Sequence, residues 1–167
     1  ALYKYTDIND IPYSKYQDFS GGQSLKDKAF DVKFVLLKET ESFPQIAFGI
    51  RDLGGTNRFA AEYLVASKYY KNFDFTVGMG FGTLASTYNG FSNPLTKLHE
   101  TFRVRGNSGE SGTGGSLSPD AWLSGDRVSI FGGFEYFFSN LPNTRLKLEY
   151  DTTNYDTEGE RPILQES

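Results

Sequence analysis

The segment F-D-F-T-V-G-M-G-F-G at residues 73–82 decides the fold that we expect from this sequence. Large apolar side chains occupy every second position from Phe73 to Phe81, and Asp, Thr and glycine fill the positions between them. Successive side chains of a β-strand point to opposite faces of its sheet. This alternation therefore predicts a strand with one apolar face and one polar face.

Further segments alternate in the same way, at residues 30–36, 44–52, 58–66, 128–138 and 145–151, with the weakest contrast at 58–66. Short connections at 40–43, 70–72 and 139–143 alternate along the chain with longer ones at 53–57 and 86–126. Strands that run up and down place such short turns at one end and such loops at the other. We therefore expect an all-β chain, an antiparallel up-and-down meander of about six strands.

The remaining segments lack this alternation. Residues 1–27 are polar and rich in tyrosine, which predicts an irregular segment with at most a broken strand at 4–16. The β-segment then covers 28–155, with the long loop at 86–126, and residues 156–167 form a tail. The Gly- and Ser-rich run at 107–119 predicts that part of the long loop is mobile.

The composition excludes several classes of function. The chain has 167 residues, no cysteine and a single histidine, His99. Disulfide scaffolds, thiolate zinc sites and cysteine nucleophiles are therefore excluded, and we expect no metal and no cofactor. Lys and Arg total 17 against 21 Asp and Glu, a net charge of -4, so the chain has no excess of positive charge with which to bind nucleic acid.

The alternation leaves two environments open for the apolar face. In a soluble β-barrel or β-sandwich this face turns inward and can bind a ligand, whereas in a membrane barrel it faces lipid. The strand lengths, of about nine to eleven residues, suit a bilayer crossing. The opposite positions mix small residues with charges of both signs, as in a water-lined interior. Tyrosines close to strand ends suit a lipid headgroup region, at Tyr69, Tyr70, Tyr136 and Tyr150.

Several motifs resemble one bacterial family. They include K-A-F-D-V-K-F-V-L-L-K-E-T-E-S-F-P-Q-I-A-F-G-I-R-D-L-G-G-T at residues 28–56, E-Y-L-V-A-S-K at 62–68, Asn93-Pro94 and L-K-L-E-Y-D at 146–151. The chain is similar in these stretches to the YjbH-type outer-membrane proteins of exopolysaccharide and capsule gene clusters. The resemblance implies part of a transmembrane β-barrel in the bacterial outer membrane, involved in polysaccharide export or assembly and without known enzymatic activity.

The resemblance also implies a longer protein, because family members usually exceed this length by far. Six strands cannot close a membrane barrel, since known single-chain barrels have at least about eight. We therefore expect the chain to be a segment of a larger barrel. The partners expected on this interpretation are outer-membrane lipid, a polysaccharide, and further strands from the same protein or from other protomers, and no nucleic acid.

On this interpretation the two sets of alternating side chains receive roles. The expected lipid-facing residues are Phe34, Phe48, Phe75, Val77, Phe81, Ile130 and Leu148. The expected lumen-facing polar track consists of Asp31, Lys33, Arg51, Glu62, Lys68, Asp74, Arg145, Lys147, Glu149 and Asp151. Such a track could be a lattice of cross-strand ion pairs, a surface that holds passing sugars weakly, or both. A third function, an outer-membrane carbohydrate hydrolase with two lumenal carboxylates, remains the weaker alternative.

Overall fold

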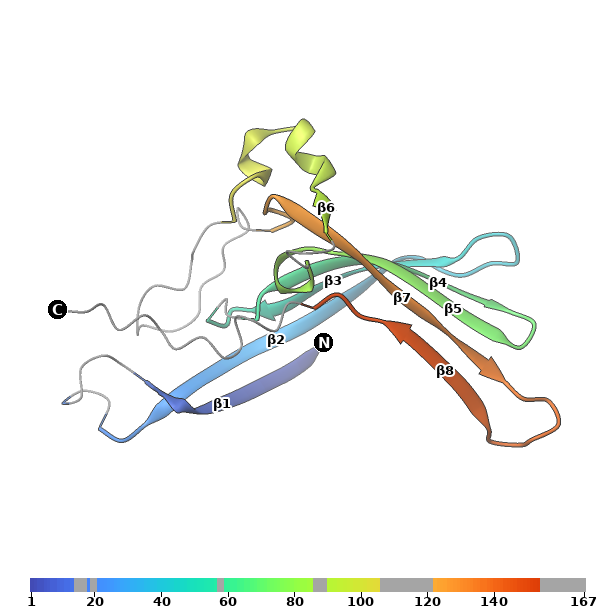
Figure 1. The fold of residues 1–167 in the computed structure, drawn as a ribbon, viewed down its shortest axis with the longest axis horizontal. Helices are drawn as coiled ribbons and strands as arrows, with labels where there is room; N and C mark the ends of the chain where they lie inside the picture. The colour runs from blue at the N-terminus through green and yellow to red at the C-terminus, as the bar shows by residue number, and fades with distance from the viewer. Residues whose placement is uncertain (14–17, 19–20, 57–58, 86–89, 106–121, 154–167) are drawn as a thin grey trace.

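The computed structural model describes residues 1–13, 18, 21–56, 59–85, 90–105 and 122–153. These residues form one antiparallel sheet of eight strands, which is curled like part of a barrel wall (Figure 1). The strands are β1 (Leu2–Pro12), β2 (Ser24–Leu37), β3 (Gln45–Leu53), β4 (Ala61–Tyr70), β5 (Phe73–Gly80), β6 (Phe91–Ser92), β7 (Arg127–Phe137) and β8 (Arg145–Tyr150). The expected all-β antiparallel meander is confirmed.

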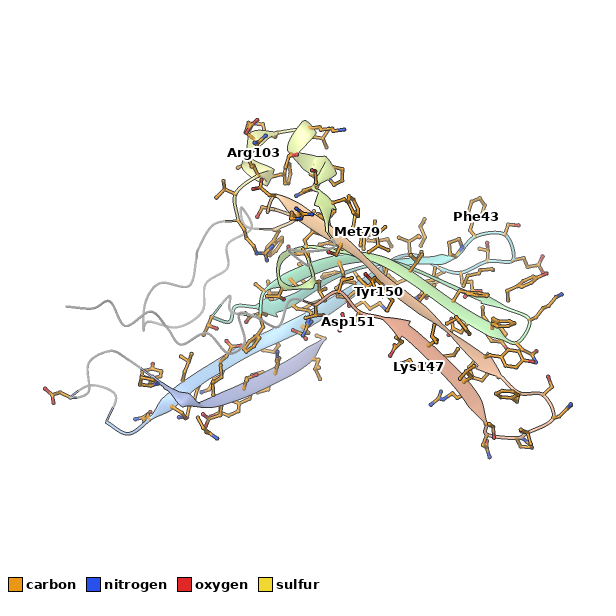
Figure 2. The ribbon with its side chains drawn as sticks, viewed as in Figure 1. Phe43, Met79, Arg103, Lys147, Tyr150 and Asp151 are labelled. Atoms are coloured by element: carbon orange, nitrogen blue, oxygen red, sulfur yellow. The ribbon has the colours of Figure 1, made fainter. Side chains whose placement is uncertain are left out.

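Strands that follow one another in the chain also pair with one another from β1 to β5, and β7 then pairs with both β5 and β8. The short connections β2–β3, β4–β5 and β7–β8 lie at one end of the sheet, as the sequence predicts. Figure 2 shows Phe43 at the tip of the first of these turns. Lys71 and Asn143 adopt positive φ angles of 54° and 61°, which the tight turns require.

The N-terminal segment differs from the expectation. Instead of an irregular stretch, β1 pairs with the first half of β2, from Leu2 opposite Asp31 to Ile8 opposite Leu25. One face of this pair is exposed, and the other carries the buried Ala29 and Asp27. Lys4 and Thr6 lie opposite these two residues on β1, so no contrast between apolar and polar positions marks β1 in the sequence. Pairing with β2 holds β1 in place, and the Lys4 ammonium lies over the Phe59 ring, 4.3 Å from its centroid. This half of β2 extends past the end of β3, which pairs with β2 only from Phe30 to Leu37.

A lobe of irregular structure sits at the loop end of the sheet, and we define it as residues 90–105 and 122–126. It contains β6 and two 3-10 turns, η2 (Pro94–Lys97) and η3 (Glu100–Phe102), where a long loop was expected. The side chain of Asn93, only 1% exposed, holds it together. Its amide donates to the carbonyls of Leu123 and Gly125, both at 2.9 Å, and its oxygen accepts from the Leu95 N–H at 3.0 Å.

Two further expectations, the mobile run at 107–119 and the tail at 156–167, lie outside the described residues. Within the described part of the chain, no helix has the length and hydropathy needed to span a bilayer.

Candidate functional site

The strand register sorts the side chains of the sheet onto two faces. Residues directly opposite one another in an antiparallel pair point to the same face. One continuous row across five strands consists of Phe34, Phe48, Leu64, Met79 and Ile130. We call the face that carries this row the apolar face. Its larger members are exposed over the middle of the sheet rather than packed against other elements.

Most residues expected to face lipid lie on the apolar face, namely Phe34, Phe48, Phe75, Val77, Ile130 and Leu148. Phe48 is half-buried and the other five are exposed; Val77, for example, is 55% exposed. The expectation for Phe81 is wrong, because its side chain is only 2% exposed. Phe81 follows the end of β5, where its N–H donates to the Glu62 carbonyl at 2.9 Å and the side chain turns into the interior.

The opposite face, which we call the polar face, carries most of the expected polar track. The register and ion pairs place Asp31, Lys33, Arg51, Asp74, Arg145, Lys147 and Glu149 on it. Asp151 follows the end of β8 and lines the cavity on the same face. The sequence therefore predicted that these eight residues group on one face.

Glu62 and Lys68 do not belong to this group. They lie on the apolar face, opposite Ile50 and Phe75 respectively, and share that face with Leu64. The prediction failed because the alternation at 58–66 is weak, so the two faces of β4 cannot be told apart there. Both charges lie toward the ends of the apolar face. The Lys68 ammonium is 3.2 Å from the Glu39 carboxylate and donates to the Thr40 carbonyl in the β2–β3 turn.

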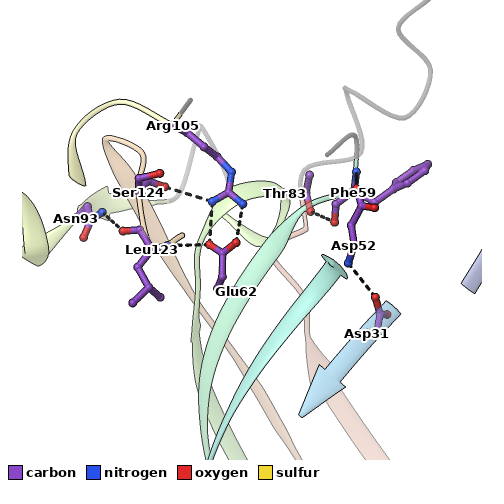
Figure 3. A network of polar contacts seen from close by, with 9 residues as sticks. All are labelled: Asp31, Asp52, Phe59, Glu62, Thr83, Asn93, Arg105, Leu123 and Ser124. Atoms are coloured by element: carbon purple, nitrogen blue, oxygen red, sulfur yellow. Dashed lines mark hydrogen bonds and ion pairs between the residues drawn. The ribbon is translucent and has the colours of Figure 1, made fainter. Parts of the chain in front are cut away.

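At the other end, Glu62 is buried beneath the lobe and is only 1% exposed. The Arg105 guanidinium binds its carboxylate with two parallel hydrogen bonds of 2.7 and 2.8 Å (Figure 3). The Leu123 N–H adds a third at 2.9 Å. Bidentate charge-assisted bonds of this kind are the strong ones, and they fasten the lobe to β4. Arg105 lies in a loop without periodicity, so no pattern in the sequence identifies this partner.

Between these two charges runs an apolar band. Glu62 and Lys68 are six residue steps apart along β4, which corresponds to about 20 Å at roughly 3.3 Å per residue. This is close to the height of the apolar band of outer-membrane barrels, which is about 25 Å. Exposed aromatic side chains lie beside its turn end, including Tyr70 and Phe43, whereas Tyr69 lies opposite Asp74 on the polar face.

The polar face holds a cavity of about 370 Å³. Its lining comes from β5, β7 and β8: Asp74, Thr76, Phe131, Gly132, Gly133, Phe134, Glu135, Lys147, Glu149, Tyr150 and Asp151. The ring of Phe131 lies across Gly78, where an added Cβ would be 2.3 Å from the Phe131 Cζ atom. Tyr63 covers Gly49 in the same way and meets Phe131 edge-on, with the ring centroids 6.2 Å apart.

Charged side chains surround this cavity as a partial ion-pair lattice. Glu135 binds Arg145 at 3.3 Å and Lys147 at 3.8 Å, and Lys147 also contacts Glu149 at 2.8 Å. Asp74 stands directly opposite Glu135, so two like charges are neighbours on adjacent strands. Within the described residues, the Asp74 carboxylate has no hydrogen-bond or ion-pair partner. The lattice that the sequence suggested is thus present on β7 and β8 and leaves Asp74 out.

A second acidic group lies beyond the apolar band, past the row of Ile50 and Glu62. Asp27 is fully buried and Asp52 is 3% exposed. Asp27 accepts from the Thr56 N–H at 2.8 Å and Asp52 from the Phe59 N–H at 3.0 Å. Among the described residues, one oxygen of each carboxyl has no hydrogen-bond partner. Burial, together with the nearby charge of Asp27, raises the pKa of Asp52 to about 7.

This second group ties the β3–β4 connection to β2. The Asp52 N–H donates to the Asp31 carboxylate at 3.0 Å (Figure 3). Gly55 packs against both buried carboxyls, since an added Cβ would lie 1.7 Å from an Asp52 oxygen and 2.9 Å from an Asp27 oxygen. In the described part of the chain, no group of three or more His, Asp or Glu side chains could hold a metal ion.

The sheet can therefore do two things at once. Its apolar face presents an exposed hydrophobic surface, and its polar face presents a cavity with carboxylates, a hydroxyl and an aromatic ring. Hydrogen-bond acceptors beside an aromatic ring suit a ligand that has both hydroxyl groups and apolar C–H surfaces.

Comparisons with known proteins identify the family of the chain. The model of the YjbH family, described as "Exopolysaccharide biosynthesis protein YbjH", matches residues 1–167. The "Uncharacterized lipoprotein YjbH" of Escherichia coli (strain K12) is 43% identical over 164 residues, which cover 98% of this chain and 23% of that protein. The chain thus spans about a quarter of the length of this curated relative. No solved structure matches the chain.

Proposed function

The chain belongs to the YjbH family of exopolysaccharide biosynthesis proteins, and from this premise we propose that it forms part of the wall of an outer-membrane β-barrel. The barrel takes part in exopolysaccharide or capsule export or assembly and does not act as an enzyme. The relative in Escherichia coli is named a lipoprotein, and a membrane association of that protein is consistent with the proposal.

The exposed apolar face is the observation that carries this proposal. Large side chains from five strands are open on it, among them Phe34, Leu64, Phe75, Val77, Ile130 and Leu148. Soluble monomers rarely expose contiguous apolar patches larger than a few hundred Å². Covering each such side chain is worth about 1.5 to 3 kcal/mol. Lipid acyl chains supply this cover without any further protein layer.

The polar face supports the same proposal from the other side. Charges of both signs, hydroxyls and glycines alternate with the apolar residues along the same strands. A wall with lipid on one face and water on the other requires this alternation. A soluble barrel with the same alternation would bury the apolar side chains, which here are exposed.

The sheet edges support a larger barrel. Among the described residues, β8 pairs only with β7, and β2 lacks a partner beyond β3 from Val32 to Leu37. Each unpaired backbone group costs several kcal/mol in lipid. Further strands must therefore continue the sheet on both sides. The relative is about four times as long as this chain, so the same protein can supply them, with other protomers as the second source.

Membrane insertion of the full-length protein tests the proposal. We expect it to stay in the outer-membrane fraction after alkaline extraction, even when any residue that carries a lipid anchor is replaced. Deletion of its gene should reduce polymer on the cell surface. A full-length protein that dissolves without detergent once its anchor is removed would contradict the barrel.

The cavity carboxylates favour one second candidate, a carbohydrate hydrolase. Asp74 and Glu149 line the same cavity and could act as acid and base. The ion-pair lattice already explains Glu149, so we expect Asp74→Asn and Glu149→Gln to leave polymer turnover unchanged. Loss of turnover in either variant, with normal membrane insertion, would establish the hydrolase instead.

A further inference from the structure

We propose that the cavity on the polar face is a binding subsite for an uncharged pyranose unit, with the Phe131 ring as its stacking surface. This inference rests on the proposed function only in taking a glycan as the ligand. The residues, their register and the charge of the lining are features of the sheet itself.

The stacking surface of the proposed subsite is the ring of Phe131. Phe131 lies opposite Gly78 on the polar face, whereas Ile130 and Gly132, the residues before and after it, point to the apolar face. Glycine at position 78 lets the ring lie against the backbone of β5, because an added Cβ would approach its Cζ atom to 2.3 Å. The edge of Tyr63 fixes the ring from the side. The ring is half-buried and lines the cavity, so one surface stays available to the C–H face of a sugar.

Hydrogen-bond acceptors are placed around this ring. Asp74 and Thr76 on β5 and Glu149 on β8 line the cavity on either side of the glycine at position 133. The Thr76 hydroxyl is 3.1 Å from that of Ser67, which fixes its position. The Asp74 carboxylate has no partner among the described residues. Sugar hydroxyls are donors that such an open carboxylate can bind.

The charge of the lining selects the class of sugar. Carboxylates come from Asp74, Glu135, Glu149 and Asp151, while Lys147 is the only cation among the lining residues. Lys147 contacts both Glu135 and Glu149, so its charge is already neutralised. A uronic acid or phosphorylated sugar would meet repulsion from this lining. Neutral pyranoses avoid that cost.

The volume agrees with this class of ligand. A cavity of about 370 Å³ lies near the lower end of small-molecule sites, which run from about 300 to 1,000 Å³. It accommodates one or two sugar units rather than a folded chain.

Calorimetry on the detergent-solubilised full-length protein tests the subsite. The neutral probes are maltopentaose, cellopentaose and isomaltopentaose, and the acidic probe is pentagalacturonic acid. We expect at least one neutral probe to bind and the acidic probe to bind at least tenfold more weakly. Phe131→Leu should weaken neutral binding about three- to tenfold, the range expected for loss of one ring contact. Phe75→Leu, on the apolar face, is the matched control and should leave binding unchanged.

A charge variant tests the selection against acidic sugars. Asp74→Asn should bring the affinities for neutral and acidic probes closer together, whereas Asp126→Asn, in the exposed lobe, should not. The inference is overturned if none of the neutral probes binds, if the acidic probe binds as well as they do, or if Phe131→Leu binds like wild type.

Failure of the subsite and failure of the proposed function are distinguishable. Absent probe binding, in a protein that inserts into the outer membrane and supports export, overturns the subsite alone. Binding that depends on Phe131, in a full-length protein that needs no detergent, overturns the barrel and leaves the subsite standing.

Discussion

At the scale of single residues, the pair Glu62 and Arg105 makes the sharpest prediction about stability. Arg105→Ala would leave the Glu62 carboxylate buried, with the Leu123 N–H as its only partner among the described residues. Removing one partner of a buried ion pair costs about 3 to 5 kcal/mol. We expect a loss near this size in urea unfolding, together with faster thermolysin cleavage within residues 90–105.

The lobe offers a matched control for this prediction. Arg103 also pairs with a glutamate, Glu100, at 3.2 Å, but both side chains are more than half exposed. Exposed pairs contribute about 0 to 1 kcal/mol, so Arg103→Ala should change little. Equal effects of the two alanine variants would show that the Glu62 pair does not fasten the lobe.

Asp52 makes a prediction about pH. Its pKa is raised from 3.8 to about 7, by burial first and then by Asp27, with Asp31 adding to the rise and Lys4 opposing it. The folded state therefore binds this proton more tightly than the unfolded state does. The stabilisation is complete below pH of about 4, declines as the pH rises toward 7 and is lost above that. The decline amounts to at most about 4 kcal/mol, since one pKa unit equals about 1.4 kcal/mol.

Thermal unfolding between pH 4 and pH 8 measures this decline. We expect Asp52→Asn to remove it, because asparagine is neutral, has the same shape and tolerates the φ of 61° at this position. Asp74→Asn, on the open polar face, should retain it. A wild-type profile parallel to that of Asp52→Asn over this range would refute the assignment.

At the scale of strands, β5 tests which face meets lipid. Val77 lies in the middle of the apolar band, between Ala66 and Gly132 on the neighbouring strands. Val77→Arg, like Phe75→Arg, should cost about 2 to 4 kcal/mol in a bilayer. Thr76→Arg places the same charge on the polar face of the same strand and should fold efficiently. Folding yield in lipid vesicles gives the comparison, and wild-type yields for Val77→Arg and Phe75→Arg would contradict lipid contact.

The strands also show how far the sequence alone determines the structure. Strong alternation predicted both the strand and its faces from Phe73 to Gly80, because apolar and polar character differ at every second residue, and it failed only past the strand end, at Phe81. Strand β1 has no such contrast and forms by pairing with an overhanging part of β2, which a local pattern cannot reveal. The same limit explains Glu62: its partner Arg105 is 43 residues away, in a loop without periodicity.

The sequence also predicted some residues of the candidate site and missed others. Asp74, Lys147 and Glu149 were grouped correctly by alternation, which fixes the face of each residue. Phe131 interrupts the polar side of its segment, and alternation alone treats it as an irregularity. Its role becomes visible only when the register places it beside Gly78, a contact between strands that are far apart in the sequence.

At the scale of the whole molecule, the free edges of β2 and β8 determine what this span can do alone. Both edges flank the apolar band, where unpaired N–H and C=O groups have no water to bind. A closed barrel has no such edges and resists dissolution by detergent, whereas an open sheet can be unravelled strand by strand from either side. This difference between a closed barrel and an open sheet predicts that the full-length protein and this span behave differently in dodecyl sulfate.

We expect the full-length protein, folded in lipid, to keep its fold in dodecyl sulfate at room temperature and to change its electrophoretic mobility only after boiling. The isolated span of 167 residues should show no such shift, or should resist only as an oligomer in which copies pair through the edges of β2 and β8. Gel migration with and without boiling, after cross-linking to count the copies, separates these outcomes. A monomeric span that resists the detergent would mean that the sheet closes without further strands, and the need for additional barrel strands would then be refuted.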